Sequence, residues 1–527
     1  MMDLVATAFE TVYGALDVSR TVTEGYKVWF ALAGLTLALS WKWLHARGLA
    51  KQFLIALTLL ASANYARWGF ESTFQRLDSY DLLHYYLNSK YFDELGYYDL
   101  YPAAILADKE NDGFFQPVGD RYMAQNAEGH QIAPIEHALA HGKIVRDRFA
   151  PERWEQFEHD LLFFQREVRP GFPGNAALWR EMIQDHGFNG TPAWMVLAEP
   201  IAQRVPVENI KALAFIDLVL LGAGVAMVVW AYGPITAWWV VFWLAISYSM
   251  RWPYVPWVFL RYDWVFALLA TMALLKKRQH LLAGLFAGWA GTLRFFPALW
   301  MWGPFAKGVA GLAAKKVNKP LLVLAGGFLI SAAVFEAAGA MRVGPDNVVV
   351  HFENMMDHNK PEQLSSRRIG LALAMTHPLS EKPPKLLSKE RRHAIERQKP
   401  YRYAIGILIM VVMGAGMRRL RDDEAYGFGF IPFFLLTTAS YYYYTARVTM
   451  ALLHAADLSK TRNRVGLAML MGMEAFSNWA AYDDAKQRMF LIGWLAIMLL
   501  GYTLTMTLWL FKESYVDAAP EEPVAAP

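Results

Sequence analysis

Cysteine is absent from all 527 residues, which excludes disulfides, cysteine-ligated zinc, iron–sulfur clusters and cysteine nucleophiles. Charged residues are scarce, at 19% against roughly 25% in soluble globular chains. The net charge is only +4, so we expect no nucleic-acid partner. Neither a P-loop nor a Rossmann fingerprint is found in the sequence. These shortages argue against a purely soluble enzyme.

Apolar residues are abundant instead. Hydrophobic types make up 55% of the chain and aromatic types 15%, and the 20 Trp and 25 Tyr favour membrane interfaces. A helix needs about 17–25 apolar residues to cross a bilayer. Apolar runs approaching that length lie at 27–44, 52–69, 211–231, 235–250, 262–275, 281–294, 296–306, 320–338, 401–417, 426–443, 445–457, 465–478 and 489–511. They predict an all-α polytopic membrane protein of about 11–13 transmembrane helices.

Two pairs of these runs leave alternatives open. The pairs are 281–294 with 296–306 and 426–443 with 445–457. Each is either a broken helix or one helix with a re-entrant segment, because its members are short for a complete span.

The basic residues predict the orientation. They gather in the short segments 42–51, 276–278, 307–319, 418–421 and 460–464, which fall on one side of the predicted spans. The positive-inside rule makes that side cytoplasmic. We therefore expect a multi-pass protein of the cell membrane, with two large loops outside the cytoplasm.

This orientation divides the chain into six segments. We expect a two-span hairpin, a first extracytoplasmic loop, a transmembrane core, a second extracytoplasmic loop, a C-terminal transmembrane region and a disordered cytoplasmic tail, at 1–69, 70–210, 211–338, 339–400, 401–511 and 512–527. In the first loop, residues 102–135 lack periodicity and are predicted to be irregular. The apolar spacing over 154–168 predicts a helix, packed either on its own domain or in the membrane interface.

A polar motif follows the second span. Asp78 and Asp81 precede His84-Tyr85-Tyr86, and a helix of about four turns is expected up to Gly96, a plausible C-terminal cap. Asp78 as N-cap with Asp81 three residues later resembles a capping box. A carboxylate at a helix N-terminus can equally serve as a preorganised base. The Asp81–His84 spacing could also ligate a metal, although one such pair is a weak signal.

A second candidate lies at the end of an apolar run. Gly284 and Gly288 form a small-xxx-small step for close helix contact. Arg294 follows within or at the edge of the apolar stretch, where a charge is costly and usually has a partner or a task. Snorkelling of its side chain to the interface is the structural alternative.

The chain resembles the integral-membrane glycosyltransferases of the GT-C superfamily. It is most similar to the polyprenyl-phosphate-sugar-dependent family that includes actinobacterial mannosyltransferases. The resemblance is carried, in order, by Asp81 to Tyr85-Tyr86, by Thr191-Pro192-Ala193 and by Gly284 to Arg294 and Pro297, with weaker echoes at Ser365–Leu371 and Ser440–Tyr444. It implies a GT-C-like bundle whose active site faces the extracytoplasmic side.

The resemblance also implies the chemistry. A sugar would move from a polyprenyl-phosphate donor to a hydroxyl of a lipid or glycan acceptor, with inversion and with Asp81 as base. Membrane lipids would be its other partners. No resident cofactor or protein-bound metal is implied, while an assisting divalent metal stays open. The residues expected to bind substrate are Asp78, His84, Tyr85, Tyr86, Trp194, Arg261, Arg294, Arg367 and Arg368.

A rival interpretation is a transporter or flippase for a lipid-linked or polar solute. Arg294 and Glu336, inside apolar runs, would suit that role as well. The long outward loops and the lack of an internal repeat favour the enzyme.

Overall fold

The computed structural model describes residues 20–69, 74, 77–111, 121–126, 129–166, 179–180, 182–251, 255, 257–358, 360, 368–377, 388–483 and 488–515. Up to residue 251 the elements are α2 (Arg20–Ala46), α3 (Ala50–Tyr65), α5 (Ser79–Leu82), the π-helix η1 (Leu83–Leu87), α6 (Asn88–Lys90), α7 (Phe92–Leu95), α8 (Leu100–Glu110), β1 (Arg121–Asn126), β2 (Gly129–Pro134), α9 (Ile135–Arg146), α10 (Pro151–Arg166), α12 (Pro192–Arg204), η2 (Val207–Asn209), α13 (Ile210–Tyr232), α14 (Pro234–Ile246) and η3 (Tyr248–Arg251).

The second half is also almost entirely helical. It contains α15 (Asp263–Lys276), α16 (His280–Arg294), η4 (Phe296–Met301), α17 (Trp302–Ala313), α18 (Lys319–Val343), α19 (Pro345–His358), β3 (Arg368–Ile369), α20 (Leu371–Met375), α21 (Lys389–Arg397), α22 (Lys399–Gly416), η6 (Met417–Arg419), α23 (Asp422–Gly427), α24 (Phe430–Leu436), β4 (Ala439–Ser440), η7 (Tyr441–Arg447), α25 (Val448–Ala455), α26 (Thr461–Asp483) and α27 (Arg488–Tyr515). The strands form two small antiparallel pairs, β1 with β2 and β3 with β4.

Four helices in the described residues are long and apolar enough to cross a membrane. They cover Val207–Tyr232, Lys319–Val343, Lys399–Arg419 and Gly493–Tyr515. The chain is therefore a predominantly α-helical membrane protein, as predicted. The other apolar runs coincide with helices that are shorter, less apolar or interrupted, so the count of 11–13 spans stays a prediction.

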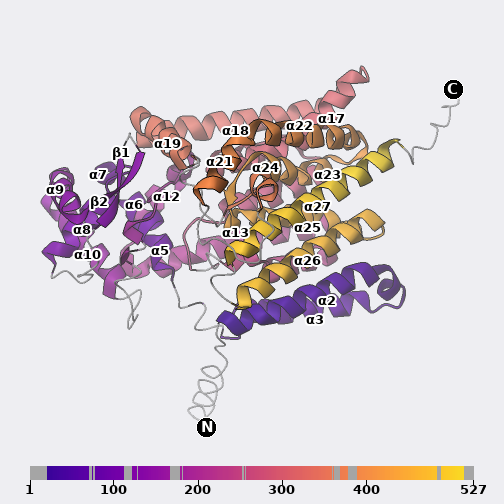
Figure 1. The fold of residues 1–527 in the computed structure, drawn as a ribbon, viewed down its shortest axis with the longest axis horizontal. Coiled ribbons are helices and arrows are strands. Elements are labelled where there is room, and N and C mark those ends of the chain that lie inside the picture. Colours follow the sequence, from indigo (N-terminus) through magenta and orange to yellow (C-terminus); the bar gives the residue numbers. More distant parts are fainter. Residues whose placement is uncertain are drawn as a thin grey trace, which may run out of the picture.

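Residues of the predicted first loop form a lobe at one end of the helical bundle, on the left of Figure 1. The prediction of irregular structure over 102–135 is wrong, because α8 and the β1–β2 hairpin occupy most of it. Short polar strands give too weak a periodicity to be recognised. Helix α10 buries Trp154, Phe157 and Leu161, which confirms that it packs on its own lobe.

The lobe is tied to the bundle by charge pairs. Arg342, at the end of α18, bonds Asp93 at 3.3 Å and also pairs with Glu199 of α12. Within the lobe, buried Lys90 pairs with Asp160 of α10 at 2.6 Å. These contacts hold α5–α7 against the ends of the long helices.

Glycines allow α16 and α18 to approach closely. A Cβ atom on Gly284 would collide with the backbone carbonyl of Leu324, and one on Gly288 would collide with that of Phe328. Gly327 of α18 lies equally close to the backbone of α16. The small-xxx-small step is therefore a helix-packing device, as predicted.

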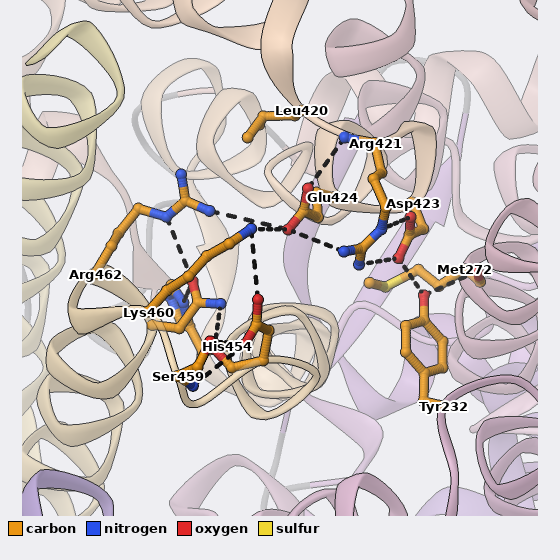
Figure 2. A network of polar contacts seen from close by, with 12 residues as sticks. Tyr232, Met272, Leu420, Arg421, Asp423, Glu424, His454, Ser459, Lys460 and Arg462 are labelled. Atoms are coloured by element: carbon orange, nitrogen blue, oxygen red, sulfur yellow. Dashed lines mark hydrogen bonds and ion pairs between the residues drawn. The ribbon is translucent and has the colours of Figure 1, made fainter. Parts of the chain in front are cut away.

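The opposite end of the bundle carries the basic segments. Asp422 accepts hydrogen bonds from Lys307 at 2.6 Å and pairs with His280 at 2.8 Å. Glu424 accepts a hydrogen bond from Lys460, and Arg421 donates two hydrogen bonds to the carboxylate of Asp423 (Figure 2). Residues of three of the five predicted cytoplasmic basic segments, 307–319, 418–421 and 460–464, thus lie together, away from the lobe (Figure 1).

Both of these pairs of apolar runs are interrupted in the structure, and the choice between a broken span and a re-entrant segment stays a prediction. Helix α16 ends at Phe295, whose φ of 55° breaks the helix before η4 and α17. Helix α24 ends at Leu436, and β4 and η7 separate it from α25. The predicted start of the disordered C-terminal tail at residue 512 is wrong, because residues 512–515 complete helix α27. The rest of the predicted tail, 516–527, lies outside the described residues.

Candidate functional site

The helix after the second predicted span carries the central carboxylate. Asp78 is its N-cap, and its Oδ1 accepts the backbone N–H of Asp81 at 3.1 Å, so the predicted cap is confirmed. The helix continues through the π-turn η1, a feature common at functional sites. It breaks at Tyr91, and α7 then ends at Gly96, whose φ is 55°.

Asp81 forms a buried ion pair with Arg261. Its Oδ1 lies 3.0 Å from Arg261 Nε, and the two side chains are 5% and 9% exposed. The second carboxylate oxygen, Oδ2, is buried and has no hydrogen-bond partner among the described residues, and the same holds for Arg261 Nη1. An unsatisfied buried polar group costs about 1–3 kcal/mol, so the site is incomplete as it stands.

Burial dominates the acidity of Asp81. It raises the pKa of the carboxyl to about 7, against the opposing charges of Arg261 and Arg294. The negative charge of Asp78 adds to the rise. A carboxyl with a pKa near neutrality is suited to general base chemistry.

The backbone and the side chain of Arg261 are both fixed by neighbouring residues. Asp217 of α13 is completely buried and accepts the backbone N–H groups of Arg261 at 3.0 Å and Tyr262 at 2.7 Å. The guanidinium lies over the ring of Tyr85, 4.0 Å from its centroid, and 5.9 Å from that of Tyr442. These contacts fix the cation beside Asp81.

Arg294 ends α16 on the same side of the bundle. It is partly exposed, and its guanidinium donates to the carbonyls of Leu293 at 2.8 Å and Leu260 at 3.4 Å. Its charge acts on Asp81. Leu260 also accepts the indole N–H of Trp194 at 3.0 Å. Arg294 therefore adds positive charge near Asp81.

An aromatic wall backs the ion pair. Trp194 packs edge-on against Tyr85 with 5.4 Å between ring centroids, and the hydroxyl of Tyr85 donates to Asn189. Thr191 caps α12 by accepting the N–H of Trp194 at 3.1 Å. The structure thus joins the predicted residues Asp81, Tyr85 and Trp194.

Two residues of the motif serve the lobe instead. His84 uses both ring nitrogens, at 2.7 Å from the Tyr80 carbonyl and 2.7 Å from the Tyr101 hydroxyl. Tyr86 donates to the Val205 carbonyl at 2.8 Å. Successive helical residues point in different directions, so Tyr85 reaches Arg261 while Tyr86 does not.

The second predicted loop contributes Arg368. This residue pairs β3 with β4, and its guanidinium donates to the Thr438 carbonyl at 3.2 Å. It interacts electrostatically with Tyr442 and Tyr443, and Tyr442 also lies near Arg261. The tyrosine run of η7 thus connects two of the predicted cations. Arg367 lies outside the described residues.

Sequence reasoning missed Asp217 and His351. Asp217 is a lone carboxylate in an otherwise apolar run, a signal that was available. His351 of α19 is completely buried, and Arg294 acts on it electrostatically. A single histidine in an amphipathic helix carries no comparable signal.

The described residues form no cluster of metal-ligand type around Asp81. No group of three or more His, Asp or Glu side chains there could hold a metal ion. A cavity of about 350 Å³ lies between the lobe and the start of α19, lined among others by Tyr97, Asn347 and Val350.

Comparisons with known proteins add no relative. No protein-family model, curated protein or solved structure matches the chain. The resemblance to the GT-C superfamily therefore stays a prediction that rests on the motifs.

Proposed function

We propose that this protein is a membrane glycosyltransferase of GT-C type, which moves a sugar from a polyprenyl-phosphate carrier to an acceptor hydroxyl on the extracytoplasmic side. The observation that carries the proposal is the pair of unsatisfied atoms at the centre of the site. Asp81 Oδ2 lacks a donor and Arg261 Nη1 lacks an acceptor among the described residues. The hydroxyl of the acceptor substrate supplies the missing donor to Asp81 Oδ2. An oxygen of the donor phosphate supplies the missing acceptor to Arg261 Nη1.

The step balances with these groups alone. Asp81 takes the proton of the acceptor hydroxyl as its oxygen attacks the anomeric carbon. The bond from that carbon to the phosphate oxygen breaks, and the polyprenyl phosphate leaves with the electron pair. Arg261 and Arg294 stabilise the charge that develops on this phosphate. One base and direct displacement lead to inversion.

Tyr85 and Trp194 supply further support. The ring of Tyr85 keeps the Arg261 guanidinium in place, and Trp194 supports that ring. The buried surroundings strengthen the interaction between Asp81 and Arg261. The lobe and α19 lie at the end of the bundle opposite to the basic segments, which agrees with an extracytoplasmic site under the positive-inside rule (Figure 1).

Transfer by purified protein in nanodiscs tests the proposal. Polyprenyl phosphates carrying different sugars are supplied together with membrane glycolipid extracts as acceptors. We expect release of polyprenyl phosphate and a glycosylated product. Arg294→Ala should cripple transfer, whereas Arg294→Lys should keep part of it, because Lys retains the charge without the planar fork.

A transporter would give a different result in the same preparation. Sealed vesicles would then accumulate or flip the lipid-linked sugar without any change in its covalent structure. Movement of the intact donor across the membrane, with no release of polyprenyl phosphate, would contradict the glycosyltransferase proposal and support a flippase.

A further inference from the structure

His351 is unsatisfied in a way that no structural role explains. Its side chain is completely buried, and neither ring nitrogen has a hydrogen-bond partner among the described residues. It packs between Tyr97, at 5.3 Å between centroids, and Phe295, at 5.8 Å. Two unpaired nitrogens inside an aromatic cluster destabilise the empty protein, so an apolar ring would suit this position better.

Its position links it to the site of transfer. Phe295 directly follows Arg294, and burial, together with the charge of Arg294, lowers the pKa of His351 to about 4. The imidazole is therefore neutral at pH 7 and offers one donor and one acceptor. A phosphate diester can use only the donor, whereas a sugar hydroxyl can both donate and accept.

The nearest cavity is separated from His351 by the ring of Tyr97. Tyr97 packs on His351 and also lines the cavity of about 350 Å³ between the lobe and α19, which falls in the range of small-molecule sites. On its other side the imidazole packs against Phe295, which is partly exposed, and Phe352, which is exposed, so only these two rings separate it from the surface there.

We propose that His351 binds a hydroxyl group of the transferred sugar and so helps to select it. This inference rests on the proposed function, because the sugar reaches His351 on a donor whose phosphate lies at Arg294. The residue positions the donor and does not enter the chemical step.

Substitution of two buried histidines by phenylalanine tests whether the nitrogens of His351 are unsatisfied in the ligand-free protein. His351→Phe keeps the ring packing and removes the unsatisfied nitrogens, so the ligand-free protein should melt about 1–3 °C higher. His454 is the matched control, because it is equally buried but its nitrogens face Tyr502 and Asn463. His454→Phe should lower the melting temperature. A loss of stability in His351→Phe similar to that control would overturn the inference.

Binding of short donor analogues tests whether His351 recognises the sugar of the donor. Farnesyl phosphate is compared with farnesyl phosphates that carry mannose, glucose, galactose or arabinose. The wild type should bind at least one sugar-bearing analogue about tenfold or more tightly than farnesyl phosphate. His351→Phe should lose that preference and bind farnesyl phosphate unchanged, while His351→Gln, which still donates and accepts, should keep part of it.

The outcomes separate the two proposals. A sugar preference that survives His351→Phe overturns the role of His351 and leaves the glycosyltransferase intact. Weaker binding of farnesyl phosphate itself would place His351 at the phosphate and overturn the sugar role. If the wild type binds none of the analogues, the proposed function fails, and the role of His351 fails with it.

Discussion

The carboxylate of Asp217 accepts the backbone N–H of Arg261 at 3.0 Å, across 44 residues of sequence. Its other oxygen accepts the neighbouring N–H of Tyr262 at 2.7 Å. A buried carboxylate on α13 therefore fixes the chain at the point where Arg261 turns toward Asp81. Asp217 touches neither Asp81 nor a substrate through these bonds, so its contribution is to position the cation.

Asp217→Asn should lower the rate of transfer by about tenfold or more. The amide keeps one acceptor oxygen and leaves one backbone N–H unsatisfied, at a cost of about 1–3 kcal/mol. The turnover number should fall while the KM for the acceptor changes little. The reason is that Arg261, the cation proposed to bind the phosphate, moves while the base Asp81 stays in place. Exposed Asp147 is the control, and Asp147→Asn should leave both constants unaltered. Equal activity in the two variants would contradict the positioning role.

Asp81→Asn should reduce transfer by about 10²–10⁴-fold, the usual effect of losing a general base. Asp78→Asn should be far milder, because an amide oxygen can still accept the N–H of Asp81 as a cap. Turnover is measured on monodisperse protein, together with the melting temperature of each variant. An inactive Asp78→Asn beside an active Asp81→Asn would move the base by one helical turn.

The pH profile should report Asp81. Its pKa is raised to about 7, so the base is protonated below that pH and transfer should rise about tenfold per pH unit up to neutrality. The folded carboxyl holds its proton more tightly than the unfolded one, so its contribution to stability is lost as the pH rises from about 4 to 7. The residual rate of Asp81→Asn should lack this inflection, and an identical inflection there would assign it to another group.

The contact of α16 with α18 should tolerate no added side chain. Gly284→Val places atoms against the Leu324 backbone and should destabilise the protein by at least about 1–3 kcal/mol. Gly326, on α18, has open space around it, so Gly326→Val is the matched control and should fold normally. Detergent-solubilised protein is compared by size-exclusion chromatography and thermal unfolding. Similar behaviour of the two variants would exclude close packing.

Orientation can be tested cleanly, because the chain has no native cysteine. Exposed Gln131 in the lobe and exposed Lys316 between α17 and α18 are replaced singly by cysteine. A membrane-impermeant maleimide on intact cells should label position 131 and spare 316 until the membrane is permeabilised. The reverse pattern would put the lobe and Asp81 in the cytoplasm.

Local rules were enough for most of the long helices of this protein. Long apolar runs predict helices because a buried backbone must satisfy its own hydrogen bonds. The cap at Asp78, the end of the segment at Gly96 and the close contact at Gly284 follow equally from residue chemistry. The β1–β2 hairpin was missed because its short strands are largely polar.

The pairing of the site residues with one another was decided by tertiary structure. Asp81 and Arg261 are 180 residues apart, and nothing in the periodicity of either segment shows that they form an ion pair. The same holds for Asp217 and the backbone of Arg261, and for the place of His351 beside Arg294. Sequence patterns report which face of a helix is buried, whereas the partner of a buried polar group depends on how distant helices pack.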